Sequence, residues 1–255
     1  MKKQITIVTT FSDSGYEEYG RLFLESCQKY LSPEVEILVY KDDADIPAQV
    51  NTKILNLENN IPELTTFKER NKFRNEVDIK FQYQSVRFSH KVYALYHAAT
   101  TTESRYLIWL DGDTELYDYV TPEYFYKLLP EGSFVGYLGR PGEAFSECGF
   151  MIYDLQHTEA REFFNRFKWY YDTDELYNLP EWHDSFIFDV VRKEFESVGK
   201  IAGLNLSAHV TKHHFNVVLD GYIMHLKGNR KNKRGKMMEK AIRRKGELAK
   251  ARPPW

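Results

Sequence analysis

Residues 106–118 read YLIWLDGDTELYD, and this stretch decides how the rest of the chain is interpreted. Its first five residues are apolar or aromatic and run directly into Asp111-Gly112-Asp113. A short apolar run closed by turn-forming residues is typical of a buried strand, and ligands of open α/β sheets bind beyond the carboxyl ends of the strands. Two carboxylates separated by one glycine can face a single divalent cation, and Mn²⁺ and Mg²⁺ prefer such oxygen ligands. An acidic turn without a metal is the alternative, because Asp and Gly are common in turns.

The composition of the chain is that of a folded protein with one main domain. The sequence has 255 residues, of which 42% are hydrophobic and 15% aromatic, so a substantial core is expected and a disordered chain is excluded. Two cysteines, Cys27 and Cys148, make no disulfide framework and favour a reducing compartment. The apolar run near the N-terminus is too short for a signal peptide, and no stretch approaches the ~20 apolar residues that span a bilayer. We therefore expect a cytoplasmic protein.

Strand and helix patterns alternate along the chain. Strands are expected at residues 4–11, 35–40 and 51–57, then at 106–110, 133–138, 149–153 and 222–226. Helices are expected at 16–31, 61–79, 88–100, from 121 onward, at 158–171 and at 182–195. The first strand–helix–strand unit predicts a parallel pair with a right-handed crossover. The sequence therefore predicts one α/β domain over residues 1–228, with a mostly parallel, Rossmann-like central sheet flanked by helices, and a tail over 229–255.

The C-terminal segment is strongly basic. Residues 227–252 contain twelve Lys or Arg against two Glu, although the formal net charge of the whole chain is −2. Basic runs bind nucleic acids or anionic membranes through phosphate charge. The tail has no aromatic residue before Trp255, so we expect no nucleic-acid partner. Peripheral membrane contact and a solvated tail remain as alternatives.

Two further segments carry residues suited to binding a metal ion, phosphate or a sugar. In residues 222–231, YIMHLKGNRK, an apolar strand leads to His225 and Lys227, and imidazole binds Mn²⁺ while lysine neutralises phosphate oxygens. In residues 181–185, EWHDS, His183 and Asp184 stand beside Trp182, and carboxylates bind sugar hydroxyls while aromatic faces stack on sugar rings. The structural alternatives are a hydrogen-bonded histidine at a strand end and an Asp that only caps a helix.

Together these segments resemble a GT-A-fold glycosyltransferase over residues 4 to about 232. The resemblance rests on ITIVTTF (5–11), WLDGD (109–113), HDS (183–185) and HLKG (225–228). HLKG is similar to the H-x-x-G element of the glycogenin-like retaining family, and WHDS is similar to the W-H-D-E-S segment of the blood-group and α1,3-galactosyltransferases. The chain has Ser185 where the second family has Glu, and it lacks the K-P-W that follows the histidine element in the first.

The resemblance implies a role for each matching residue. Asp111, Asp113 and His225 would hold the Mn²⁺ or Mg²⁺ that bridges the two phosphates of a nucleotide-sugar donor, which we expect to be a UDP-hexose. The donor-binding residues would be Thr9, Thr10, Phe11, Tyr40, Asp42, Lys91, Asp111, Lys227 and Gly228. The residues by the reacting carbon or the acceptor would be Asp184, Glu147 and His183. The implied reaction moves a hexose to a hydroxyl acceptor such as a glycan. The similarity of the late histidine element to a retaining family favours retention. An inverting enzyme would need a carboxylate base, such as Asp184.

Two alternatives from other classes remain open at this point. IWLDGDTEL also resembles the D-x-D-x-T strand end of haloacid-dehalogenase-type phosphatases, in which Asp111 would be the nucleophile. Those proteins normally place this strand at the start of the domain, whereas here residues 1–105 precede it, and the late element is His225 instead of an acidic pair. The second alternative is a non-catalytic domain that binds a nucleotide sugar or a membrane.

Overall fold

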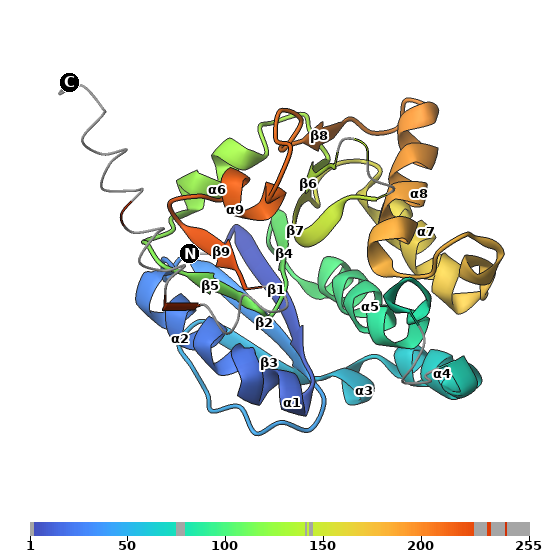
Figure 1. Ribbon diagram of the computed structural model, residues 1–255, viewed down its shortest axis with the longest axis horizontal. Coiled ribbons are helices and arrows are strands. Elements are labelled where there is room, and N and C mark those ends of the chain that lie inside the picture. The colour runs from blue at the N-terminus through green and yellow to red at the C-terminus, as the bar shows by residue number, and fades with distance from the viewer. Residues whose placement is uncertain are drawn as a thin grey trace.

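The computed structural model describes residues 3–74, 80–140, 142, 145–226, 234–235 and 243. Within these residues a seven-stranded sheet forms the centre, and a two-stranded sheet lies beside it (Figure 1). The strands are β1 Ile5–Phe11, β2 Val35–Lys41, β3 Thr52–Asn56, β4 Tyr106–Leu110, β5 Thr114–Leu116, β6 Val135–Leu138, β7 Glu147–Asp154, β8 Gly203–Asn205 and β9 Ile223–His225. The α-helices are α1 Asp13–Gly15, α2 Arg21–Tyr30, α3 Leu57–Asn60, α4 Pro62–Arg70, α5 Ser85–Thr101, α6 Pro122–Leu128, α7 Ala160–Asp172, α8 Asp184–Ser197 and α9 His214–Val218.

The large sheet has the strand order β3-β2-β1-β4-β7-β6-β8. Strands β1 to β4 run parallel, so their carboxyl ends meet at one edge of the sheet. Strand β7 runs antiparallel between β4 and β6, with Phe150 paired to Leu110 and Asp154 paired to Tyr106. β7 therefore begins at the edge where β4 ends, and its first residues join those that follow the parallel strands.

Two apolar clusters cover the two faces of the sheet (Figure 1). Helices α4, α5, α7 and α8 pack with Leu107 and Trp109 on one face. Helices α2 and α6 pack with Ile108 and Leu110 on the other face. Because successive side chains of a strand point to opposite faces, a strand buried on both sides needs an apolar residue at every position. This requirement explains the uninterrupted YLIWL of β4, all of which is buried.

The structure confirms the α/β architecture and the mostly parallel sheet expected from the sequence. Strands lie at the positions expected for β1, β2, β3, β4, β6 and β7, and β1 pairs with β2 in parallel. The helix expected at 16–31 is composite, because a π-helical turn, η1 Tyr16–Gly20, precedes α2. The helix expected at 61–79 ends at Arg70, and residues 75–79 are outside the described part. The sequence reading missed β5 and α9.

The predicted boundary between domain and tail, at residue 228, lies outside the described residues and stays a prediction. Of the tail, the structure describes Arg234, Gly235 and Arg243. The guanidinium of Arg234 pairs with the buried carboxylate of Glu115 in β5, with Nε 2.6 Å from Oε2. Among the described helices, none has both the length and the apolar character that crossing a bilayer requires.

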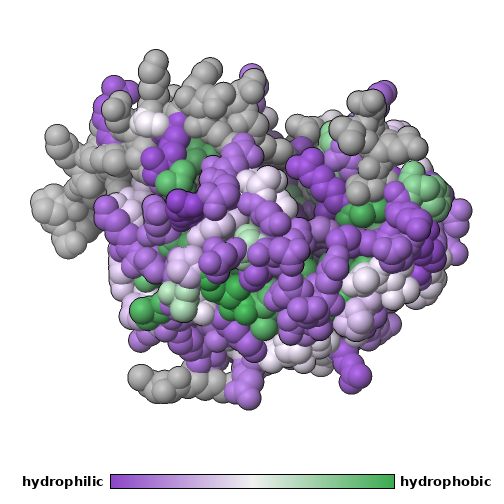
Figure 2. All heavy atoms as spheres, turned by 90° about the horizontal axis from the view of Figure 1, so that it is seen from below, coloured by the Kyte–Doolittle hydropathy of each residue, from purple (hydrophilic) through white to green (hydrophobic). Residues whose placement is uncertain are grey.

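The molecular surface is mostly hydrophilic on the face seen in Figure 2, where hydrophobic residues gather in a smaller area near the middle. The large apolar side chains that are exposed in the described part of the chain come from separate elements. They are Val50, Phe73, Phe81, Tyr119, Trp169, Val198 and Val217. Exposed apolar side chains are common on folded surfaces, so none of these residues by itself indicates a partner.

Candidate active site at the end of β4

The turn after β4 places Asp111 and Asp113 at the carboxyl edge of the sheet. The backbone N–H of Asp111 donates to the carbonyl of Gly149 at 2.9 Å, which extends the ladder to β7, and the N–H of Thr114 donates to the carbonyl of Asp111 at 3.1 Å. The indole Nε1 of Trp109 donates to Oδ1 of Asp111 at 2.7 Å. The turn is therefore held by the strand that precedes it and by the neighbouring strand, and its two carboxylates are fixed by backbone geometry.

Gly112 lets this turn lie against the first strand. A β-carbon at this position would be 2.5 Å from Cε1 of Phe11 and 3.2 Å from the carbonyl oxygen of Thr10. No side chain fits at those distances, so the glycine between the two aspartates is required by packing. The phenyl ring of Phe11 is buried among Tyr16, Tyr19 and Phe23.

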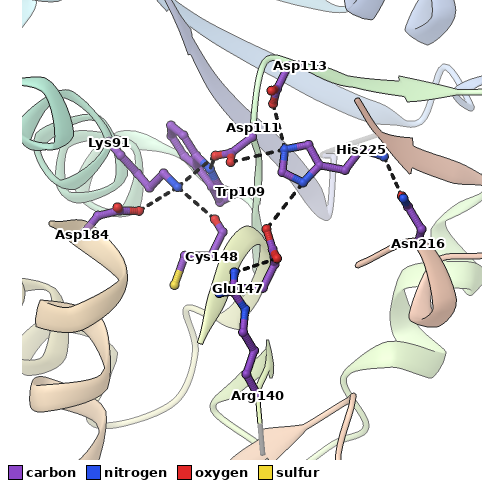
Figure 3. Close-up of polar contacts among 10 residues, drawn as sticks. All are labelled: Lys91, Trp109, Asp111, Asp113, Arg140, Glu147, Cys148, Asp184, Asn216 and His225. Carbon is purple, nitrogen blue, oxygen red and sulfur yellow. Dashed lines mark hydrogen bonds and ion pairs between the residues drawn. The ribbon is translucent and has the colours of Figure 1, made fainter. Parts of the chain in front are cut away.

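A short antiparallel ladder brings His225 to Asp113. Strand β9 pairs with β5, with Thr114 opposite His225, and the N–H of Leu226 donates to the carbonyl of Asp113 at 2.9 Å. The backbone N–H of His225 donates to Oδ1 of Asn216 at 2.8 Å. Nε2 of His225 consequently lies 2.9 Å from Oδ1 of Asp113 and 3.8 Å from Oδ2 of Asp111 (Figure 3).

Asp111, Asp113 and His225 form a donor set that fits a divalent cation. Each offers one ligand atom, and the three atoms lie within 4.8 Å of one another. Two ligands on opposite sides of Mg²⁺ are about 4.2 Å apart, so small side-chain adjustments suffice to surround one ion. Two carboxylate oxygens and one imidazole nitrogen suit Mn²⁺ or Mg²⁺. The residues that the sequence predicted as metal ligands are thus brought together, from segments more than 110 residues apart.

Lys91, from α5, joins Asp111 to Asp184 at the start of α8. Its ammonium lies 2.9 Å from Oδ1 of Asp111 and 2.7 Å from Oδ2 of Asp184, and it donates to the carbonyl of Cys148 at 2.9 Å (Figure 3). Burial favours the neutral forms of Lys91 and Asp111, but the attraction of the neighbouring opposite charges together has the larger effect on both pKa values. Asp111 and Asp184 raise the pKa of Lys91, whereas Lys91 and His225 lower the pKa of Asp111 to about 2. The sequence assigned Lys91 to the diphosphate, and the structure places its charge between these two carboxylates.

Glu147, the first residue of β7, lies on the other side of His225. Its Oε1 is 3.6 Å from Nδ1 of the imidazole, and its Oε2 is 2.7 Å from the guanidinium of Arg140 (Figure 3). The sequence proposed Glu147 on the acceptor side. It reaches the site because β7 is antiparallel to β4, a feature that the sequence pattern did not predict.

His183 is enclosed beside the site and does not open into it. Its side chain is 2% exposed, and its Nε2 lies 2.7 Å from Oε2 of Glu181. The imidazole packs against the rings of Phe81, Phe88 and Phe145. Its neighbour Asp184 is also buried and pairs with Lys91, so in this arrangement Asp184, and not His183, connects to the cluster at β4.

The residues expected to bind the nucleotide differ in accessibility. Thr9, Phe11 and Tyr40 are almost fully buried, and the phenol of Tyr40 lies 2.6 Å from Nδ1 of His97 inside the core. Thr10 and Asp42 are partly exposed at the ends of β1 and β2. Burial and neighbouring carboxylates raise the pKa of Asp42 despite the opposing charge of Lys68. Lys227 and Gly228 lie outside the described residues, so their assignment stays a prediction.

Tyr19 lies in the segment for which the sequence predicted only a helix, and no role was expected for it. Its side chain is partly exposed, and its ring packs against Phe11, which in turn lies against Gly112 of the acidic turn. Burial, with Asp113 and Asp111, raises the pKa of Tyr19 against the opposing charge of Arg87. The composite helix around η1 sets the direction of this side chain, and helical periodicity alone does not predict a π-helical turn.

Comparison with known proteins finds the fold but no sequence family. No protein-family model and no curated protein sequence matches the chain. The solved apo structure of mouse xyloside xylosyltransferase 1 matches with a TM-score of 0.53 at 12% identity, over 89% of this chain and 98% of that one. The glycosyltransferase GlyE of Streptococcus pneumoniae TIGR4 matches with a TM-score of 0.54 at 11% identity, over 89% of this chain and 55% of that one. This chain therefore spans about half the length of GlyE.

These similarities and the sheet topology define the class of fold. The chain has a GT-A-like glycosyltransferase fold, in which a mostly parallel sheet is flanked by helices on both faces. The acidic turn and the late histidine lie together at the carboxyl edge of that sheet, where open α/β sheets bind their ligands. At 11–12% identity the similarity extends to the fold alone.

Proposed function

We propose that this protein is a metal-dependent glycosyltransferase that moves a sugar from a nucleotide-diphosphate sugar to a hydroxyl acceptor such as a glycan. The observation that carries the proposal is the convergence of Asp111, Asp113 and His225 within 4.8 Å at the sheet edge of a glycosyltransferase fold. The fold similarity to known glycosyltransferases supports the coarser conclusion that the protein acts in glycosyl transfer. The cation, the donor and the stereochemistry are our inference from the site.

A bound cation would supply positive charge for the diphosphate that leaves the sugar. Asp111, Asp113 and His225 would hold that cation, and Trp109 and Lys91 fix the orientation of Asp111 through contacts of 2.7 and 2.9 Å. Lys91 also pairs with Asp184 at 2.7 Å, and this contact links the proposed metal ligand Asp111 to the start of α8. The chain's own groups thus orient the donor and keep the local charges fixed before it binds.

We propose a UDP-hexose as the donor and retention as the outcome. Retention is supported by the state of Asp184, whose side chain is 3% exposed and is paired with Lys91. A carboxylate engaged in this way is not free to take a proton from an acceptor hydroxyl, which an inverting enzyme requires of its base. In a retaining enzyme an oxygen of the donor's own phosphate can take that proton.

The alternatives receive less support from the molecule. The two matching structures described above are glycosyltransferases, which gives the phosphatase alternative no support. A non-catalytic domain that binds a nucleotide sugar would need the same cluster of ligands, so activity and not binding separates it from the enzyme. Peripheral membrane contact through the basic tail and a cytoplasmic location stay predictions.

The proposal is tested by thermal unfolding with UDP, GDP, CDP and ADP, each with and without Mn²⁺. A ligand at 100 times its Kd adds about 2.7 kcal/mol of stability, and each kcal/mol moves the midpoint of a domain of this size by about 2–4 °C. We expect UDP to raise the midpoint by several degrees only when Mn²⁺ is present. The same mixture with a UDP-sugar and candidate glycans then measures turnover.

The matched control for this experiment is Asp113→Asn, which keeps the size of the side chain and removes its charge. The variant should keep the unfolding midpoint of the free protein, lose the Mn²⁺-dependent shift and lose turnover. A shift of equal size in wild type and variant would contradict the metal assignment. No shift with any nucleotide would contradict the donor site itself.

A further inference from the structure

His225 has a carboxylate on each of its two ring nitrogens. Asp113 lies 2.9 Å from Nε2, and Glu147 lies 3.6 Å from Nδ1 (Figure 3). A neutral imidazole carries one proton, so one nitrogen donates while the other offers its lone pair. Asp113 is within hydrogen-bond distance of Nε2, whereas Glu147 lies just beyond that distance from Nδ1. The tautomer decides which of the two nitrogens is available to a cation.

The side of the ring that faces the cation is set by the acidic turn. Asp111 and Asp113 both lie toward Nε2, so the ligand nitrogen is Nε2 and the proton must then be on Nδ1. A metal-binding histidine usually donates its other N–H to a carboxylate, a carbonyl or water, which fixes both tautomer and ring orientation. Glu147 is the carboxylate that lies on the Nδ1 side.

Glu147 is itself held in place. Its second oxygen pairs with Arg140 at 2.7 Å, and the side chains of both residues are at most 15% exposed. This ion pair fixes the direction of the carboxylate and leaves its other oxygen on the Nδ1 side of His225. Arg140, before β7, therefore contacts Glu147, and Glu147 lies next to His225 at the proposed cation position (Figure 3).

The other sides of the imidazole are closed by packing. A β-carbon at residue 149 would lie 3.0 Å from Cε1 and 3.1 Å from Nδ1 of His225, so Gly149 gives the ring its space. The ring of Phe215 packs against it at a centroid distance of 4.9 Å, and Asn216 holds its backbone. Once these contacts have set the plane of the ring, the remaining choice is which nitrogen carries the proton.

We propose that Glu147 is a positioning residue that holds the proton of His225 on Nδ1 and thereby presents Nε2 to the divalent cation. This inference rests on the metal site proposed above, and it gives Glu147 a role through His225 in place of the acceptor-side role expected from the sequence. Arg140 supports it by fixing the carboxylate. No atom of Glu147 needs to touch the donor or the acceptor.

The test measures Mn²⁺ affinity directly, from the electron paramagnetic resonance signal of free Mn²⁺ titrated with protein in the absence of nucleotide. Glu147→Leu should weaken Mn²⁺ binding 10- to 100-fold, the usual cost of removing an outer partner of a ligand. Glu147→Gln should stay within about 3-fold of wild type, because its amide oxygen still accepts from Nδ1–H. Glu162→Leu, on the exposed surface of α7, is the matched control and should change nothing.

A second measurement keeps the inference testable if Glu147→Leu is poorly folded. The ¹⁵N shifts of His225 in the Mg²⁺-loaded protein, assigned with His225→Asn, should report the Nδ1–H tautomer in wild type and in Glu147→Gln. Arg140→Leu, which keeps Glu147 and removes this guanidinium, should weaken Mn²⁺ binding several-fold with the same tautomer.

The outcomes separate this inference from the proposed function. Wild type that binds Mn²⁺ while Glu147→Leu binds it equally well overturns the positioning role and leaves the metal site standing. Wild type that binds no Mn²⁺ overturns both. An acceptor-side catalyst would instead give unchanged Mn²⁺ affinity and equal losses of turnover in Glu147→Leu and Glu147→Gln, which also overturns the positioning role.

Discussion

At the scale of single residues, Gly112 connects the acidic turn to the first strand. In the sequence, this glycine was noted only as the residue that separates two carboxylates able to face one cation. The structure adds that Phe11 occupies the space where a side chain would be, with Cε1 2.5 Å from an ideal β-carbon. Phe11, which the sequence assigned to the nucleotide, thus decides whether the turn with the two proposed metal ligands has space for a side chain at residue 112.

Gly112→Ala should destabilise the protein by about 1–3 kcal/mol, the usual cost of forcing an extra carbon into a packed region. Urea unfolding measures this cost. In a Phe11→Leu background the same substitution should cost less, because the smaller side chain leaves space. An equal cost in both backgrounds would mean that the clash with Phe11 is not the cause.

His90 gives the protein an acid-sensitive position in α5. Burial, helped by the charge of Lys68 and opposed by that of Glu58, lowers the pKa of His90 from 6.5 to about 4. Between these two values the unfolded chain binds a proton that the folded chain does not, so stability is lost as the pH falls from about 6.5 toward 4. We expect a loss of about 1–2 kcal/mol between pH 7 and pH 5 from this residue, since the side chain is only partly buried.

The measurement is the urea midpoint of wild type and His90→Gln at both pH values. The variant cannot titrate and should lose less stability on acidification. His97 has a lowered pKa as well, chiefly through burial, and it contributes equally to both proteins, so the difference isolates His90. Parallel loss in the two proteins would contradict the assignment.

At the scale of helices and strands, the sequence was most informative where burial alone determines the pattern. β4 was predicted because a strand covered on both faces must be apolar throughout, and β1 and β2 because they are rich in β-branched and apolar residues. β9 lies within the strand expected at 222–226, whereas β5, with three residues, was not predicted. The pairing between β5 and β9 is a contact that no local pattern records. α9 has five residues and follows His213, whose backbone φ is 54°. Periodicity cannot identify elements of that length.

The candidate site could likewise be predicted only in part. Asp111 and Asp113 were predicted as ligands because they follow an apolar strand, and His225 because it ends one. The positions of Lys91 and Glu147 could not be derived, since they depend on which face of α5 meets the sheet and on the antiparallel direction of β7. The resemblance to glycosyltransferases suggested roles for Lys91 and Glu147, but it did not give their positions.

Arg70 joins the end of α4 to the end of α7. Its guanidinium donates to the carbonyls of Tyr171 and Asp172 at 3.0 Å and pairs with Asp174 at 2.7 Å. Last-turn carbonyls lack helical partners, and a cation there also complements the helix dipole. One side chain therefore closes α7 and ties it to the neighbouring helix.

Arg70→Met should lower the free energy of unfolding by about 1–2 kcal/mol, as expected for hydrogen bonds to a partly exposed charged group. Arg70→Lys should recover less than half of that loss, because an ammonium cannot reproduce the planar fork. Arg21→Met, which breaks the exposed pair with Glu17, is the control and should cost under about 0.5 kcal/mol. Equal losses for Arg70 and Arg21 would show that the helix end does not depend on this contact.

At the scale of the whole molecule, the basic tail is attached to the domain at Arg234. Its partner Glu115 is 3% exposed, and a carboxylate buried to that extent is costly without a cation beside it. The tail therefore contributes to the stability of the small β5–β9 sheet next to the proposed metal ligands, whatever else it binds.

Truncation after Gly228 should lower the free energy of unfolding by about 1–3 kcal/mol, the cost of leaving one buried polar partner unsatisfied. Arg234→Met in the full chain should reproduce most of the effect. Adding Glu115→Gln to the truncated chain should restore part of it, because a neutral amide tolerates burial better. Thermal and urea unfolding measure all three, and an unchanged truncated protein would mean that the pair carries no stability.

The distance along the chain between Asp113 and His225, 112 residues, also has a consequence for the protein during its synthesis. At about 5–20 residues per second, the two aspartates leave the ribosome some 6 to 22 s before the histidine that completes the donor set. During that interval the nascent chain holds two of the three ligands. If the proposed metal site is correct, full affinity for a divalent ion requires a chain that has been translated past β9 and has folded β9 onto β5.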